Sequence, residues 1–212
     1  MRRLIKICGI TNPKDALFCS RTGADRLGLI FAPSARQVTL AQGASIAESV
    51  SLMPMVGVFI NPDPLFAAEA VAAANLSFVQ VHDCTNPARL EQIATACERP
   101  VVPAVTVDQL DALDKLDSSL TLLLDLAKDP ALRTPVHVNR LHQAAADLTQ
   151  KGRTVILAGG LTPDNVAGAV RGARCLGVDV CGGVEQTPGL KNAAKVRQFI
   201  TAVRHLEEID VL

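Results

Sequence analysis

Residues 4–11 read Leu-Ile-Lys-Ile-Cys-Gly-Ile-Thr (LIKICGIT), a short apolar run that ends in Cys8 and Gly9. The run has the length and composition of a buried β-strand. An open, doubly wound α/β sheet usually carries a G-x-G-x-x-G turn after its first strand. This chain has Cys-Gly-Ile-Thr at that place instead. The missing turn favours the other large parallel-sheet architecture, a closed barrel of alternating strands and helices.

Further apolar runs follow along the chain, separated by longer amphipathic segments. Most of these runs are continuously apolar, as is typical of parallel strands that are covered on both faces. The predicted strands are residues 4–8, 26–31, 55–60, 78–81, 101–105, 120–124, 154–158 and 177–180. The predicted helices are residues 13–22, 40–51, 64–74, 88–97, 107–116, 139–151, 163–170 and 192–206.

The order of these elements predicts the fold class. Strand–helix units follow one another with no linker, low-complexity tract or change in composition. Such an order is typical of an α/β protein with a single (β/α)8 TIM barrel, a closed parallel sheet. We therefore expect one domain over residues 1–212, with the open doubly wound sheet as the alternative.

The composition excludes several classes of partner. The formal net charge is +0 and no basic cluster occurs, so the chain lacks the cations that neutralise nucleic-acid phosphates. It has no Trp or Tyr on which bases could stack. No apolar run is long enough to span a bilayer. The six cysteines are scattered and no export signal precedes them, which predicts reduced thiols in the cytoplasm.

In a barrel of this kind the active site lies at the carboxyl ends of the strands. Cys8 and Asp125 stand at the ends of the first and sixth predicted strands. A thiolate can remove a carbon-bound proton and a carboxylic acid can protonate an oxygen. Alternation places Lys6 on the same side of its strand as Cys8, where its cation favours the thiolate. Taken singly, Cys8 also fits a buried apolar thiol and Asp125 also fits the cap of a turn.

Two glycine pairs follow the last two predicted strands, at Gly159–Gly160 and at Gly182–Gly183 after Cys181. Glycines let backbone N–H groups approach an anion closely. The loops after the seventh and eighth strands are where barrels commonly hold a phosphate. The alternative is that the glycines only make tight turns. Because two pairs occur at this place, we predict phosphate binding.

Three further polar side chains belong to the same predicted mouth. Arg36 follows the second strand and is a candidate partner for a substrate carboxylate. His82 and Asp179 lie at the ends of the fourth and eighth strands and are candidates for substrate binding. Neither Cys8 nor any His stands at metal-ligand spacing, so we expect no metal.

At these residues the sequence resembles the phosphoribosylanthranilate isomerases of tryptophan biosynthesis. The matching segments are KICGIT (6–11), GADRLGLIF (23–31), SAR (34–36), VGVFIN (56–61), VQVHD (79–83), LLLD (122–125), AGGLTPDNV (158–166) and GVDVCGGVEQTPGLKN (177–192). They run through the whole chain. The first and the last two segments are specific to the family.

The resemblance implies an Amadori rearrangement that needs no cofactor. The substrate would be N-(5-phosphoribosyl)anthranilate and the product 1-(2-carboxyphenylamino)-1-deoxyribulose 5-phosphate. Cys8 maps to the general base of the family, Asp125 to its general acid and Arg36 to the arginine that binds the anthranilate carboxylate. The phosphate would lie on the backbone of 159–160 and 181–183. The implied partner is this phosphorylated small molecule, with no nucleic acid or membrane, in a monomer or a homodimer.

Two departures from the family keep other functions open. The family usually has a glycine-rich loop after the strand-six aspartate, whereas residues 126–138 contain no glycine and carry Pro130 and Pro135. The usual Ser-Ser-Gly after strand eight is here 181–183, Cys-Gly-Gly. The alternatives are a phosphate-ligand-binding barrel without turnover and an aminoaldose isomerase with a shifted substrate.

Overall fold

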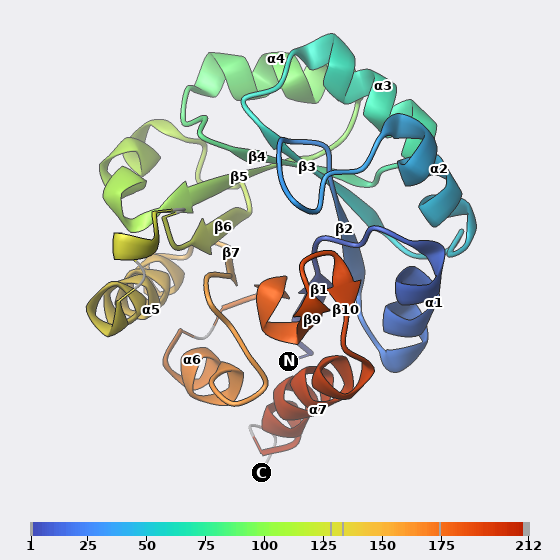
Figure 1. The fold of residues 1–212 in the computed structure, drawn as a ribbon. Coiled ribbons are helices and arrows are strands. Elements are labelled where there is room, and N and C mark those ends of the chain that lie inside the picture. Colours follow the sequence, from blue (N-terminus) through green and yellow to red (C-terminus); the bar gives the residue numbers. More distant parts are fainter. Residues whose placement is uncertain (1, 128, 133, 174, 210–212) are drawn as a thin grey trace.

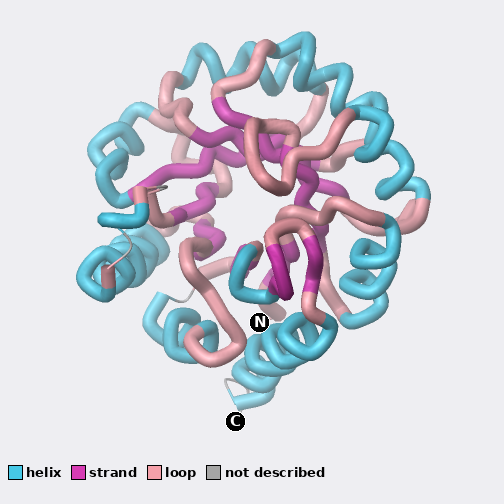
Figure 2. The backbone as a smooth tube through the Cα atoms, in the orientation of Figure 1, coloured by secondary structure: helices cyan, strands magenta, loops and turns pink. Residues whose placement is uncertain are grey.

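The computed structural model describes residues 2–127, 129–132, 134–173 and 175–209. Eight parallel strands hydrogen-bond in the order β1 to β8 and close into a barrel, with β8 next to β1. The helices surround this barrel (Figure 1), and Figure 2 shows the strands as an inner ring with the helices outside it. The predicted (β/α)8 barrel is confirmed.

The barrel strands are β1 Leu4–Ile7, β2 Arg26–Ile30, β3 Met55–Ile60, β4 Phe78–His82, β5 Val101–Thr106, β6 Leu122–Asp125, β7 Val155–Leu157 and β8 Gly177–Val180. The α-helices are α1 Pro13–Thr22, α2 Leu40–Glu48, α3 Pro64–Ala74, α4 Pro87–Cys97, α5 Pro135–Gln150, α6 Val166–Ala173 and α7 Ala193–Ile209. Three 3-10 helices, η1 Val107–Lys115, η2 Pro130–Leu132 and η3 Gly182–Val184, and a hairpin of β9 Glu185–Thr187 and β10 Leu190–Lys191 complete the fold.

The apolar residues form two layers that explain why the strands read as continuous apolar runs. Outward side chains of the strands, such as Ile5 and Ile7, belong to the large core between the barrel and the helices. A smaller cluster consists of Val102, Ala104, Leu123, Ile156 and Ala158. Both faces of the sheet are therefore dry over most of its length, as expected of a parallel barrel.

Local sequence chemistry sets most helix ends. Asn12 caps α1 by accepting a hydrogen bond from the amide of Asp15, and Pro13 opens the helix. Gly23 ends it in the left-handed conformation, with φ of 108°. The predicted bounds of this helix, residues 13–22, are confirmed. The predicted start at Pro163 is wrong, because α6 begins at Val166 after a turn.

Two other segments differ from the prediction. The segment after β5 forms a 3-10 helix over Val107–Lys115. Helix α5 begins at Pro135, so it includes part of the expected 126–138 loop. Lys128 and Arg133 of that loop lie outside the described residues. Among the residues that the structure describes, no helix is both long and apolar enough to cross a membrane.

Candidate active site

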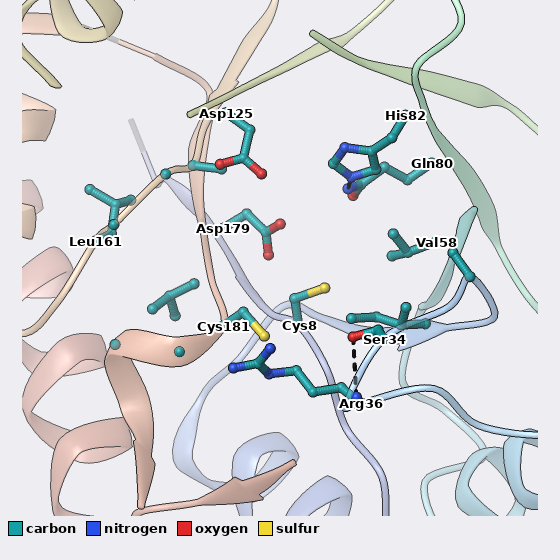
Figure 3. A pocket seen from close by; sticks show the side chains of 18 of the residues that line it. Cys8, Ser34, Arg36, Val58, Gln80, His82, Asp125, Leu161, Asp179 and Cys181 are labelled. Carbon is teal, nitrogen blue, oxygen red and sulfur yellow. Dashed lines mark hydrogen bonds between the residues drawn. The ribbon is translucent and has the colours of Figure 1, made fainter. Parts of the chain in front are cut away.

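A cavity of about 520 Å³ opens at the carboxyl ends of the barrel strands. Figure 3 shows the side chains that point into it from different strands. The structure brings every residue of the predicted site into its lining: Cys8, Arg36, His82, Asp125, Gly159, Gly160, Asp179, Cys181, Gly182 and Gly183. Residues far apart in the sequence therefore share one mouth, as the barrel topology predicts.

Strands β1 and β8 supply the charged floor of this cavity. Lys6 and Asp179 face each other in the β1–β8 register, and the ammonium Nζ lies 2.8 Å from Oδ2 of the carboxylate. Both side chains are buried. Burial alone would lower the pKa of Lys6, but the negative groups of Asp179 and Cys8 outweigh it and raise that pKa. The other oxygen of Asp179, Oδ1, is buried and has no hydrogen-bond partner among the described residues.

Cys8 is the next inward residue after Lys6, and its environment favours a thiolate. The thiol of Cys181, at the end of the neighbouring strand, lies close enough to stabilise a thiolate at Cys8 by donating a hydrogen bond to it. This bond lowers the pKa of Cys8 to about 7; burial opposes the shift and the Lys6 ammonium supports it. The pKa of Cys181 is correspondingly raised by the same bond and by burial. In the structure the thiol of Cys181 donates to Oε1 of Glu185 at 3.8 Å, so its hydrogen turns from Glu185 to Cys8 when Cys8 becomes a thiolate.

Arg36 lies on the turn after β2 and is held by an ion pair. Its Nε and Nη2 donate to the carboxylate of Glu185 at 2.8 Å and 2.6 Å. The Lys191 ammonium donates to Oε1 of the same carboxylate at 3.0 Å. Burial would raise the pKa of Glu185, but Arg36 and Lys191 hold it below its ordinary value. Sequence reasoning found Arg36 but missed Glu185 and Lys191.

The carboxylate and the imidazole of the predicted site come from the opposite side of the barrel. Asp125 ends β6 and its Oδ1 accepts a hydrogen bond from the amide of Leu126 at 2.7 Å. Figure 3 shows its carboxylate directed into the cavity. His82 ends β4, and its Nε2 lies 2.9 Å from the amide nitrogen of the buried Gln80. The Gln80 bond orients the ring toward the cavity.

The two glycine pairs shape the remaining wall of the cavity. Gly159 and Gly160 both have left-handed backbones, with φ of 81° and 68°. A Cβ at Gly159 would lie 2.8 Å from the amide nitrogen of Leu126, so no larger residue fits there without movement. Gly182 and Gly183 open η3, where the first N–H groups have no partner within the helix. The lining thus presents backbone amides that can bind an anion.

The site brings a cysteine whose environment favours the thiolate, a carboxyl group, an arginine and two glycine-rich loops around one cavity. This set can move protons on a phosphorylated substrate that carries a second acidic group. No group of His, Cys, Asp or Glu in the described part of the chain is arranged to hold a metal ion. The Thr187-Pro188-Gly189 stretch was the one sequence signal for the hairpin that carries Glu185 and Lys191, since Pro-Gly pairs mark turns.

Comparison with known proteins places the chain in a family. A family model described as N-(5'phosphoribosyl)anthranilate (PRA) isomerase matches residues 5–202. A relative from Hyphomonas neptunium, named N-(5'-phosphoribosyl)anthranilate isomerase, is 38% identical over 212 residues, which cover 96% of this chain and 98% of the relative.

Solved structures agree with this match. The phosphoribosyl anthranilate isomerase of Thermotoga maritima superposes with a TM-score of 0.85 at 31% identity, covering 97% of this chain and 100% of that one. A structure of such an isomerase in complex with reduced 1-(o-carboxyphenylamino)-1-deoxyribulose 5-phosphate superposes with a TM-score of 0.81 at 31% identity and the same coverage. The chain belongs to the N-(5'-phosphoribosyl)anthranilate isomerase family.

Proposed function

We propose that this chain converts N-(5'-phosphoribosyl)anthranilate to 1-(2-carboxyphenylamino)-1-deoxyribulose 5-phosphate in tryptophan biosynthesis. The observation that carries the proposal is the position of Cys8 and Asp125 around one cavity in a chain that matches the family model over residues 5–202. The family match does not favour the two alternative functions. The reaction is an aldose–ketose isomerisation by general acid–base catalysis and needs no cofactor.

Asp125 begins the reaction as the general acid. In its protonated form it donates a proton to the furanose ring oxygen while the bond from that oxygen to C1′ breaks. The nitrogen lone pair forms the C1′=N bond, so the ring opens to a protonated Schiff base. The cationic nitrogen then serves as the electron sink for the next step.

Cys8 continues it as the general base. Its thiolate removes the proton on C2′, and the electron pair of that bond forms a C1′=C2′ double bond while the iminium nitrogen becomes neutral. The resulting enolamine tautomerises to the ketose product. A base with a pKa of about 7 is matched to proton transfer near neutral pH, because it is both populated as thiolate and strong enough to accept the proton.

The other lining residues hold the substrate. Arg36 binds the anthranilate carboxylate, and the backbone of 159–160 and 181–183 binds the phosphate. The buried Oδ1 of Asp179 lacks a donor among the described residues, so a sugar hydroxyl can supply the missing hydrogen bond. His82 contacts the sugar from the other side of the cavity.

The test follows the fluorescence of N-(5'-phosphoribosyl)anthranilate with the purified chain. We expect Cys8→Ala and Asp125→Asn each to lower kcat by about 10²–10⁴-fold, as for loss of a general base or acid. Cys97→Ala and Asp108→Asn change the same residue types outside the cavity lining and should retain turnover. Turnover by Cys8→Ala near the wild-type rate would contradict the mechanism. Binding of the reduced product analogue without turnover by the wild type would contradict the function.

Two further expectations concern the state of the protein. All six cysteines are free in the structure, which fits a reducing compartment such as the cytoplasm. The chain is expected to be a monomer or a homodimer, which light scattering during gel filtration distinguishes.

A further inference from the structure

Arg36 lies on a turn, so its guanidinium needs support if it is to recognise one carboxylate. Its side chain keeps 25% of its surface exposed, whereas the Glu185 side chain that binds it is only 4% exposed. Glu185 belongs to the β9–β10 hairpin, far from Arg36 in the sequence. Arg36 is a cavity-lining residue and Glu185 is not. The hairpin therefore fixes Arg36 from behind without touching the cavity.

The geometry of the ion pair leaves part of the guanidinium available. Glu185 receives Nε and Nη2, which form one edge of the guanidinium group. A guanidinium has five N–H donors in a planar fork. The other edge, formed by Nη1 and the second hydrogen of Nη2, can still bind a carboxylate bidentately. Arg36 can thus bridge Glu185 and a substrate carboxylate in one plane.

The negative charge of Glu185 would cancel the positive charge of Arg36, and Lys191 prevents this by neutralising Glu185. Glu185 and Arg36 alone make a neutral pair, which gives a second carboxylate little attraction. The Lys191 side chain is 0% exposed and its ammonium lies 3.0 Å from Oε1 of Glu185. It also donates to the carbonyl of Cys181 at 3.3 Å. Because Lys191 neutralises Glu185, the three groups together carry one positive charge, and it faces the cavity through Arg36.

We propose that Glu185 and Lys191 are positioning residues that turn Arg36 into a binding group for the substrate carboxylate. Glu185 sets the orientation of the guanidinium and Lys191 leaves its charge uncompensated. This inference rests on the proposed function. The inference goes beyond that function in one respect. It assigns a new role to the hairpin, which is to distinguish aminoaldoses with an ortho-carboxylate on the ring from those without one.

The test compares two substrates that differ only in this group, N-(5'-phosphoribosyl)anthranilate and N-(5'-phosphoribosyl)aniline. The measured quantity is the ratio of their kcat/KM values. We expect Lys191→Met to lower this ratio by about tenfold or more, the size expected when a charge-assisted contact is lost. The double variant Glu185→Gln/Lys191→Met keeps the net charge at one positive but removes the carboxylate that orients Arg36, and it should lower the ratio by a similar factor. For Lys191→Met the change should appear mainly in KM for the anthranilate substrate. Both substrates carry the phosphate, so any disturbance of the phosphate loop cancels in the ratio.

Lys195→Met is the matched control. Lys195 is exposed and donates to the backbone carbonyl of Glu185, at 3.1 Å, and not to its carboxylate, so its removal should leave the ratio unchanged. Circular dichroism shows whether each variant is folded; if Lys191→Met does not fold, the double variant Glu185→Gln/Lys191→Met carries the test. An equal loss for both substrates, or a ratio that stays or rises in the folded variants, would overturn the inference. Absence of turnover by the wild type with both substrates would instead overturn the proposed function and the inference with it.

Discussion

Cys8 shows how the neighbours of one thiol decide its chemistry. Burial favours the neutral form, as it does for Cys19, whose pKa burial raises to about 12. At Cys8 the donated hydrogen bond from Cys181 and the ammonium of Lys6 outweigh burial and lower the pKa to about 7. Two buried cysteines of the same chain thus differ widely, because Cys8 has a hydrogen-bond donor as well as a cation beside it, whereas the cation near Cys19, Lys191, is opposed by Asp15.

The effect of the Cys181 donor on the pKa of Cys8 should appear in the pH dependence of turnover. The thiolate is the active form of Cys8, so kcat/KM should rise as the pH increases through about 7. Cys181→Ala removes the donor, and the rise should move to higher pH because the thiolate loses its hydrogen bond. Cys181→Ser retains an O–H donor and should keep the rise near its wild-type position. The measurement is a pH profile of kcat/KM for the three proteins; equal profiles for the two variants would contradict the role of the donor.

At the scale of elements, the sequence predicts the buried strands because most of them are continuous apolar runs that a polar or glycine residue follows. It does not predict the short hairpin, because strands of two or three residues show no periodicity. The 3-10 helix η1 carried a readable signal. Val107, Leu110, Leu113 and Leu116 recur every three residues, which matches the three residues per turn of a 3-10 helix.

The same limits apply to the site. Its ten residues could be predicted because each lies at a strand end or in a segment typical of the family. Glu185 and Lys191 lie in the family segment 177–192 as well, but nothing in the sequence shows that the folded hairpin places them behind Arg36. The late start of α6 also depends on contacts that form only in the folded chain. The Asn165 side chain accepts a hydrogen bond from the amide of Thr162 and donates one to the carbonyl of Gly160. These bonds hold residues 160–165 as a loop beside the cavity.

Closure of the barrel between β8 and β1 depends on a glycine. A Cβ at Gly177 would lie 2.6 Å from Cβ of Leu4 and closer still to the carbonyl of that residue. Gly177→Ala should therefore lower the free energy of unfolding by about 1–3 kcal/mol, as overpacking does. Gly168→Ala places the same methyl group in open space on α6 and should raise the free energy of unfolding by about 0.5–1 kcal/mol. Urea unfolding measures both, and equal effects would contradict this account of the closure.

At the scale of the whole molecule, the Lys6–Asp179 pair joins the first strand to the last. The two residues are 173 positions apart, and their buried ion pair lies next to the thiol of Cys8. A buried pair gains little over an apolar pair of similar volume, because desolvation offsets the attraction. Its presence here is better explained by Cys8, whose thiolate needs a cation that solvent does not screen.

If this explanation holds, two variants of the pair should differ in stability while both have low activity. Lys6→Met leaves Asp179 buried without its cation and should lower the free energy of unfolding by about 3–5 kcal/mol. Lys6→Met/Asp179→Asn removes both charges, so most of that stability should return while turnover stays low, since Cys8 has lost its cation. Lys14→Met, on the exposed face of α1, is the control and should change neither. Urea unfolding and kcat measure the two effects; a double variant that regains turnover, or that is no more stable than Lys6→Met, would contradict the argument.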